Sequence, residues 1–119
     1  MKIKLGLLLF GILMIGCLQK NRIVNFADVT KDSKIVLYHK DTTSRICEIN
    51  LIFKGEINGD ALIYIEDGGY NYKRKYMLNK GKVDYKIGGD WYNSKCIVNY
   101  KPLNVTKGSL SIEYEFFDF

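Results

Sequence analysis

The stretch from Arg45 to Asp67, RICEINLIFKGEINGDALIYIED, decides the fold class of this chain. Its first half has apolar residues at the alternate positions Cys47, Ile49, Leu51 and Phe53, and Glu48, Asn50 and Lys54 lie on the other, mostly polar face. Successive side chains of a strand point to opposite faces, so this alternation predicts a strand with one face in a core and one in water. The apolar run Ala61–Ile65 that follows is typical of a second short strand.

A turn signal separates these two segments. Asn58 and Gly59 stand directly between them, and an Asn-Gly pair flanked by apolar strands is the strongest short hairpin signal. The reason is that a type I′ turn needs positive φ at both of its central residues. The sequence therefore predicts that the two strands pair with each other as a β-hairpin.

The rest of the chain also has the pattern of short strands. Short segments rich in apolar and β-branched residues recur at roughly ten-residue spacing, and they cover 34–40, 72–78, 83–87, 96–100 and 110–116. The glycine-rich segment Gly88–Ser94 is interpreted as a loop. No helical period is found after Cys17. We therefore expect an all-β fold, a small antiparallel β-sandwich of about seven strands, with a small β-barrel as the alternative.

The N-terminus has the pattern of a targeting segment. Lys2 and Lys4 form a cationic start, and an apolar stretch from Leu5 to Ile15 follows. A charged start, an apolar stretch of about 7–15 residues and a small residue before the cut describe a secretory signal peptide. The stretch is shorter than the ~20 residues that a membrane-spanning helix needs, so a retained span is the weaker alternative.

The residues at the end of this segment carry a recognisable motif. Met14-Ile15-Gly16-Cys17 resembles the lipobox of bacterial lipoproteins, although Met14 stands where leucine is more common. The resemblance implies that the Cys17 thiol is lipidated and that Cys17 becomes the mature N-terminus. Ordinary cleavage beside a chance cysteine remains the alternative. We expect a signal peptide at 1–16, a lipid-anchored tether at 17–33 and a β-sandwich domain at 34–119, exported and held at the cell envelope, facing the periplasm or the cell exterior.

The two remaining cysteines are predicted to form a disulfide. Cys47 and Cys96 each fall on the apolar face of their own strand, and no Cys-x-x-Cys spacing indicates a metal or redox site. Disulfides persist in exported proteins, and a bridge closing a loop of about 50 residues would stabilise the domain by roughly 4 kcal/mol. Two free buried thiols are the alternative.

Charge and motifs argue against several classes of function. The formal charge is +5, and removal of Lys2 and Lys4 with the leader lowers it to +3. Scattered lysines of this number are compatible with an anionic membrane or cell-wall polymer and argue against nucleic acid as a partner. His39 is the only histidine, and no nucleophile, phosphate-binding or metal-binding motif is found. We therefore expect neither catalysis nor a cofactor or metal.

Two segments are candidate ligand-binding surfaces. The first is the Gly88–Ser94 loop, whose Trp91 and Tyr92, beside Asp90, would form a platform for a sugar ring or a protein partner if exposed. Alternatively, Trp91 folds back onto the core. The second interleaves cations with aromatic rings around Tyr72 and Arg74, where the simpler alternative is a strand with its tyrosines packed inward.

Together these features predict a non-catalytic binding or interaction module of the cell envelope. Its expected partners are the membrane, through the N-terminal lipid, and an envelope protein or glycan. The alternative is a periplasmic inhibitor or immunity lipoprotein that blocks a hydrolase or toxin. A charge of +3 on the mature chain matches a basic enzyme poorly.

The lipid assignment is tested by replacing one atom. Cys17→Ser removes the acceptor thiol, and we expect it to abolish incorporation of a radiolabelled or clickable fatty acid that the wild-type chain incorporates. Cys47→Ser is the control and should be labelled as strongly as wild type. Equal labelling of wild type and Cys17→Ser would contradict the assignment.

Overall fold

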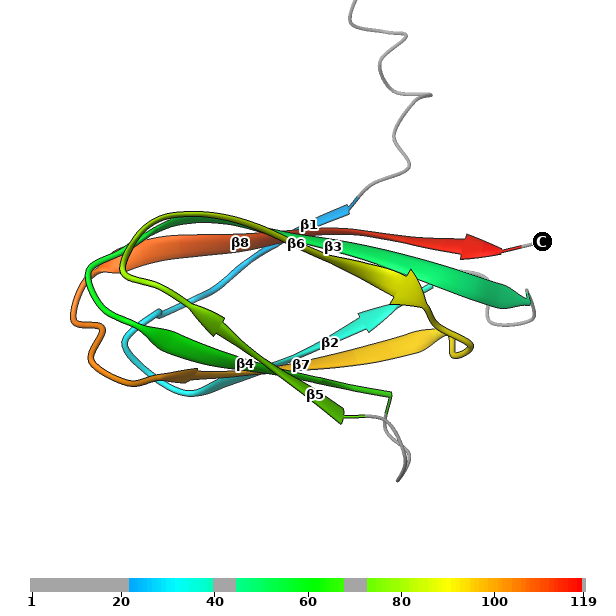
Figure 1. The fold of residues 1–119 in the computed structure, drawn as a ribbon, viewed down its shortest axis with the longest axis horizontal. Helices are drawn as coiled ribbons and strands as arrows, with labels where there is room; N and C mark the ends of the chain where they lie inside the picture. The colour runs from blue at the N-terminus through cyan, green and yellow to red at the C-terminus, as the bar shows by residue number, and fades with distance from the viewer. Residues whose placement is uncertain (1–21, 40–44, 68–72, 119) are drawn as a thin grey trace, which may run out of the picture.

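A computed structural model describes residues 22–39, 45–67 and 73–118 of the chain, and every regular element among them is a strand (Figure 1). The eight strands are β1 Arg22–Asn25, β2 Ser33–Tyr38, β3 Ile46–Ile57, β4 Ala61–Glu66, β5 Lys73–Leu78, β6 Gly81–Asp90, β7 Lys95–Pro102 and β8 Gly108–Asp118. Those residues contain no helix of the length and hydrophobicity that crossing a membrane requires. The predicted leader and Cys17 lie outside the described residues.

The strands form two antiparallel sheets of four, packed face to face (Figure 1). Sheet A has the order β1-β8-β3-β6, and sheet B has the order β2-β7-β4-β5. The chain changes sheet at every connection except the one from β4 to β5. An eight-stranded double sheet with this alternation is a jelly roll. The predicted all-β sandwich is confirmed, with one strand more than expected, and the barrel alternative is wrong.

The core fills the space between the sheets. Alternate residues of the central strands point inward, and those with less than 2 % exposure include Leu51, Phe53, Ile63, Val98 and Ile112. The pattern on β3 follows the predicted alternation from Ile49 onward. Tyr100 is also buried, and its hydroxyl donates to the carbonyl oxygen of Val29 at 2.7 Å. Its polar end is therefore satisfied inside the sandwich, as a buried hydroxyl requires.

The predicted hairpin at Asn58-Gly59 is wrong. β3 pairs with β6 and β8, whereas β4 belongs to the other sheet, so this segment is a corner between the sheets. The Asn58 side-chain oxygen accepts hydrogen bonds from the backbone amides of Thr106 at 2.9 Å and Lys107 at 3.1 Å. A Cβ on Gly59 would lie 2.2 Å from the carbonyl oxygen of Asn104. The β7–β8 connection packs directly against this corner, so the asparagine supplies the acceptor for its amides and the glycine leaves room for its backbone.

Two predicted boundaries also change. β1 pairs with β8, and Phe26 and Val29 after it are buried, so the sandwich begins at Arg22 and the predicted domain boundary at residue 34 is too late. β6 continues through Asp90, so the predicted loop at Gly88–Ser94 shrinks to the segment after that residue. Gly89 lies within this strand and has a φ of 145°, a backbone conformation that favours glycine.

The predicted disulfide is absent, and Cys47 and Cys96 are free thiols. The cause is a register shift in β3 between Ile46 and Glu48, where a β-bulge interrupts the pairing with β8. An extra residue in one strand reverses which side chains face the core. Ile46 therefore takes the buried position and Cys47 is only half-buried, while Cys96 is fully buried on the other sheet.

The corner between the sheets yields a stability prediction. Asn58→Ala removes the acceptor for two backbone amides, and we expect it to lower the free energy of unfolding by about 1–2 kcal/mol. Urea denaturation measures the change. Asn79→Ala is the matched control, because Asn79 is exposed in the β5–β6 connection, and it should change stability by less than about 0.5 kcal/mol. Equal effects of the two variants would contradict the assigned role of Asn58.

Candidate binding surfaces

Trp91, which was predicted as a possible platform, lies in the core. Its side chain is 3 % exposed, and its indole nitrogen donates to the carbonyl oxygen of Lys95 at 3.0 Å. Its backbone amide donates to the carbonyl oxygen of Cys47 at 3.1 Å and so ties the end of β6 to β3. Trp91 thus closes one end of the sandwich, which is the alternative in which it folds back onto the core.

Tyr92 and Asp90 on either side of it are exposed. Tyr92 is 75 % exposed, more than any other large hydrophobic side chain in the described part of the chain. The loop is held by neighbouring connections, because the Asn93 side chain donates to the carbonyl oxygen of Asp67 at 3.3 Å. The carbonyl oxygen of Ser94 accepts from the backbone amide of His39 at 2.8 Å. Of the two rings of the predicted platform, only that of Tyr92 is exposed, and it lies on a loop that these two hydrogen bonds hold in place.

The second predicted segment begins outside the described residues, where Tyr72 lies. Arg74 is exposed on β5, and its guanidinium donates to the hydroxyl of Tyr76 at 3.2 Å. The ring of Tyr76 packs edge-on against the ring of Tyr85 on β6, with centroids 6.1 Å apart. This pair covers one open side of the sandwich, where β5 and β6 are the outermost strands of their sheets. The inward packing considered for Tyr76 is therefore confirmed, and Arg74 flanks it.

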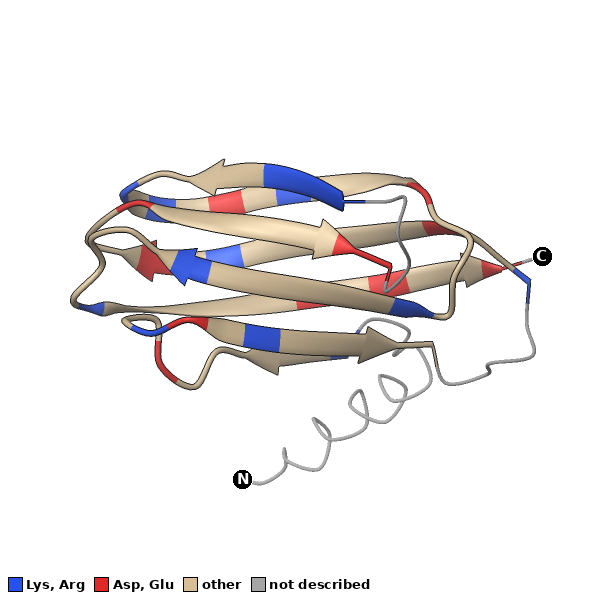
Figure 2. Ribbon diagram, turned by 90° about the horizontal axis from the view of Figure 1, so that it is seen from below, with Lys and Arg blue, Asp and Glu red and all other residues tan. Residues whose placement is uncertain are grey.

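The structure reveals a surface that the sequence analysis missed. Strand pairing in sheet B places alternate residues of β2, β7, β4 and β5 side by side on the outer face, facing away from sheet A. Five of these outward residues are lysines, namely Lys34, Lys73, Lys75, Lys95 and Lys101. Glu66 is the one carboxylate among the outward positions of these four strands. Figure 2 shows the lysines spread over the near sheet, and we call this surface the lysine face.

Apolar side chains lie between the lysines. Ile97 points outward from β7 but is only 8 % exposed, because its neighbours on the face cover it. Tyr64 and Leu62 on β4 are half-buried, whereas Tyr38 at the edge is 56 % exposed. The lysine face therefore consists of ammonium groups arranged around an apolar and aromatic floor.

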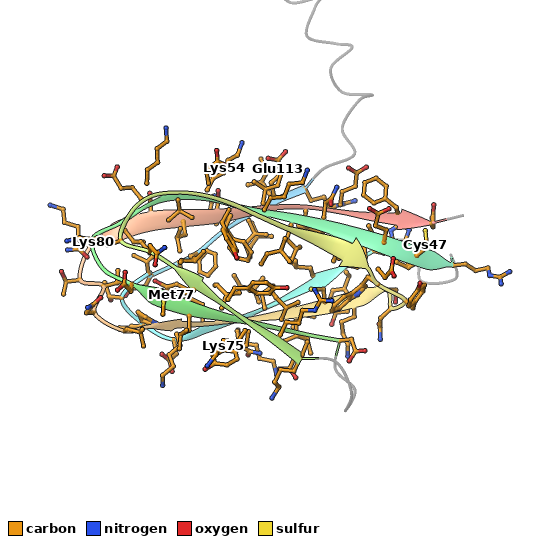
Figure 3. All side chains as sticks on the ribbon, in the orientation of Figure 1. Cys47, Lys54, Lys75, Met77, Lys80 and Glu113 are labelled. Carbon is orange, nitrogen blue, oxygen red and sulfur yellow. The ribbon has the colours of Figure 1, made fainter. Side chains whose placement is uncertain are left out.

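The outer face of sheet A has the opposite charge. Its outward positions on β3, β6 and β8 carry six carboxylates, namely Glu48, Glu56, Asp84, Asp90, Glu113 and Glu115. Three lysines accompany them, namely Lys54, Lys82 and Lys86. The Lys54 ammonium lies 3.9 Å from the Glu113 carboxylate, and in Figure 3 both project from the side opposite Lys75. Charge is thus separated between the two broad faces of the domain.

The ammonium groups of the lysine face have no ion-pair partner within the described residues. The ion pairs found there, with nitrogen and oxygen within 4.0 Å, are Lys54–Glu113 and His39–Asp118, and neither involves this face. No alternation in the sequence marks Lys34 as outward, because the continuous apolar run Ile35–Tyr38 follows it. The convergence of the five lysines depends on the strand order β2-β7-β4-β5, which no local pattern encodes.

A depression of about 370 Å³ indents the lysine face over β2, β7 and β4. Its lining consists of Asp32, Ser33, Lys34, Tyr64, Asn99, Tyr100 and Lys101. Asn99 lies in the middle, because strand pairing puts Lys34 directly opposite it on one side and Tyr64 on the other. The Asn99 side-chain nitrogen donates to the Glu66 carboxylate at 2.7 Å, which fixes the orientation of the amide.

The described part of the chain groups no three His, Cys, Asp or Glu side chains in a way that could hold a metal ion. Burial raises the pKa of the Cys96 thiol to about 12, and the negative charge of Asp67 adds to the effect. Cys96 therefore stays protonated at neutral pH and is inert as a nucleophile, since the thiolate is the reactive form.

Comparison with known proteins gives no family. No protein-family description and no curated protein matches the chain. Among solved structures, the Yersinia pseudotuberculosis-derived mitogen is similar at 14 % identity, with 83 % of this chain and 86 % of that chain covered and a TM-score of 0.46. The carbohydrate-binding module TmCBM61, solved with β-1,4-galactotriose, is similar at 9 % identity, with coverage of 84 % and 83 % and a TM-score of 0.43. No functional assignment follows from either similarity.

The different burial of the two adjacent aromatic residues predicts opposite outcomes on mutation. Trp91→Ala empties a core position and should lower the free energy of unfolding by about 3–5 kcal/mol. Tyr92→Ala removes an exposed ring and should change it by less than about 0.5 kcal/mol. Thermal and urea unfolding of the two variants measure the difference. A small effect of Trp91→Ala would mean that this side chain lies outside the core.

Proposed function

We propose that this chain is an exported, lipid-anchored and non-catalytic binding module of the cell envelope, and that it binds an anionic partner through the lysine face. The observation that carries the proposal is the convergence of five lysines against one outward carboxylate on sheet B. Charges of one sign on one surface attract an oppositely charged partner over a distance of about one Debye length, ~8 Å at physiological salt.

The lysine face belongs to a rigid element. Its five lysines sit on paired strands whose inner side chains form the core, so their backbone positions are fixed before any partner binds. Binding to such a surface costs little backbone entropy, because only the lysine side chains are ordered. The apolar floor around Ile97 adds contact area between the ammonium groups.

Export and anchoring rest on the sequence of the leader. The lipobox-like residues before Cys17 support a lipid anchor, and four residues lie between Cys17 and Arg22, where β1 begins. The five steps along the chain from Cys17 to Arg22 span at most about 18 Å, so a lipid at Cys17 would keep the domain close to the bilayer. The expected partner is accordingly a component of the envelope.

The acidic face of sheet A supports a second candidate, the inhibitor or immunity lipoprotein. The net charge of the mature chain matches a basic enzyme poorly, but the six carboxylates on sheet A form a locally acidic surface. Such a surface complements a basic hydrolase or toxin by the same electrostatic argument. This candidate uses the opposite side of the sandwich, so surface variants separate the two functions.

The test measures retention on isolated envelopes. Residues 1–17 are replaced by a signal peptide that is removed completely, so that lipid makes no contribution, and the secreted domain is sedimented with envelopes. We expect retention that falls several-fold when salt is raised from about 50 to about 300 mM. Lys73→Gln/Lys75→Gln on the lysine face should weaken it about ten-fold. Lys82→Gln/Lys86→Gln, the same charge change on sheet A, should leave it unchanged.

Three outcomes would contradict the proposal. The first is absence of retention, and the second is an equal loss in both double variants. The third is release of soluble fragments from the envelopes, which would indicate catalysis. A stoichiometric complex with one secreted enzyme that is weakened by Glu48→Gln/Glu115→Gln, and not by the lysine variants, would instead support the inhibitor.

A further inference from the structure

The depression on the lysine face has the chemistry of a site for one acidic sugar unit. We infer that the lysine face binds an acidic polysaccharide, with the anionic group of one unit between Lys34 and Lys101 and its ring against Tyr64. This inference rests on the proposed function and names the class of ligand for that surface.

The strand register brings the two lysines to one point. Lys34 on β2 lies directly opposite Asn99 on β7, and directly opposite residues have Cβ atoms about 4.5–5.5 Å apart. Lys101 follows Asn99 by two residues on the same face, a distance of about 7 Å along the strand. Lysine side chains are long and flexible enough for both ammonium groups to reach one carboxylate or phosphate above Asn99.

Two carboxylates of the protein border this point, Glu66 and Asp32. Glu66 lies opposite Ile97, toward the other end of β7 from Lys101, and its carboxylate accepts the hydrogen bond of Asn99. Asp32 is the one acidic residue of the lining. The five lysines of the face outnumber these two carboxylates, and this excess of positive charge favours an anionic unit over a neutral one.

Tyr64 supplies the surface for the ring of the sugar. It lies opposite Asn99 on β4 and is half-buried, so its position is fixed by its neighbours while part of the side chain remains open to the depression. A tyrosine combines a flat apolar body with a hydroxyl that needs a hydrogen-bond partner. The C–H groups of a sugar ring can pack on the flat aromatic body, and its hydroxyl groups can hydrogen-bond with the tyrosine hydroxyl.

The concave shape favours a polymer chain over a bilayer. Tyr64 and Asn99 are half-buried and line a depression of about 370 Å³. A single polysaccharide chain can enter a hollow of this kind, whereas a bilayer surface engages groups that project from the protein. Membrane binding would use all five lysines alike, but a sugar unit in the depression depends on Lys34 and Lys101 in particular.

The experiment uses the full chain, purified as the cell processes it and kept in detergent. Polygalacturonate and hyaluronate are the acidic probes, and fully methyl-esterified polygalacturonate is the probe with the same backbone and no charge. We expect the acidic polymers to bind at least ten-fold more tightly than the ester. Lys34→Gln/Lys101→Gln should weaken this binding about ten-fold or more. The control Lys82→Gln/Lys86→Gln on sheet A should leave it unchanged.

A second variant tests the ring contact. Tyr64→Leu keeps an apolar side chain but removes the aromatic plane and the hydroxyl, and it should weaken binding several-fold without changing its salt dependence. A folded Tyr64→Leu variant that binds like wild type would remove Tyr64 from the site.

Three results would overturn the inference. These are failure to bind either acidic polymer, equal loss in the sheet A control, and lysine-dependent binding to vesicles of phosphatidylglycerol and phosphatidylcholine without binding to the polymers. Retention on envelopes separates this failure from failure of the proposed function. If envelopes retain the domain and the acidic polymers do not bind it, the binding module stands and its ligand is of another class.

Discussion

Burial of the inner face of β3 is the constraint on which the rest of the structure depends. Leu51 and Phe53 are completely excluded from solvent, and β3 pairs on both sides, with β6 and with β8. A strand with one face sealed in this way has a fixed register, because a slip of one residue would move every apolar side chain into water. This register also fixes how β6 and β8 pair with β3 in sheet A. Sheet B covers the apolar face of sheet A and so completes the core.

The same constraint confines function to the outer faces. Side chains of the paired strands alternate between the core and solvent, so half of each strand is reserved for packing. In the described residues no Asp, Glu, Lys, Arg or His side chain is buried, and the buried ionisable groups are the Cys96 thiol and the Tyr100 hydroxyl. The binding chemistry of this domain therefore depends on which outward residues the strand order makes neighbours, as with Lys34, Asn99 and Tyr64.

This explains what could be predicted from the sequence. Local alternation along 45–57 and 110–116 identifies strands and the inward residues, because both are properties of consecutive residues. The Asn58-Gly59 pair was misjudged, because the preference of these residues for tight turns does not reveal whether the next strand joins the same sheet. Cys47 was misassigned, since a single bulge reverses the alternation without a signal in the local pattern. The lysine face requires the order of all four strands of sheet B, which only the folded chain provides.

The position of β8 has a consequence for how the domain folds. The last strand lies between β1 and β3, and its pairing joins Arg22 to Tyr114 and Ile46 to Asp118. Neither β1 nor the β8 side of β3 has its partner until the C-terminus of the chain is present. Contacts between residues so far apart in the sequence also form slowly, because the entropy of closing a long loop is lost first. Sheet A therefore cannot close until β8 has been synthesised. Until then the edges of β1 and β3 that pair with β8 stay open, and open strand edges are the part of an incomplete chain that can pair with another chain.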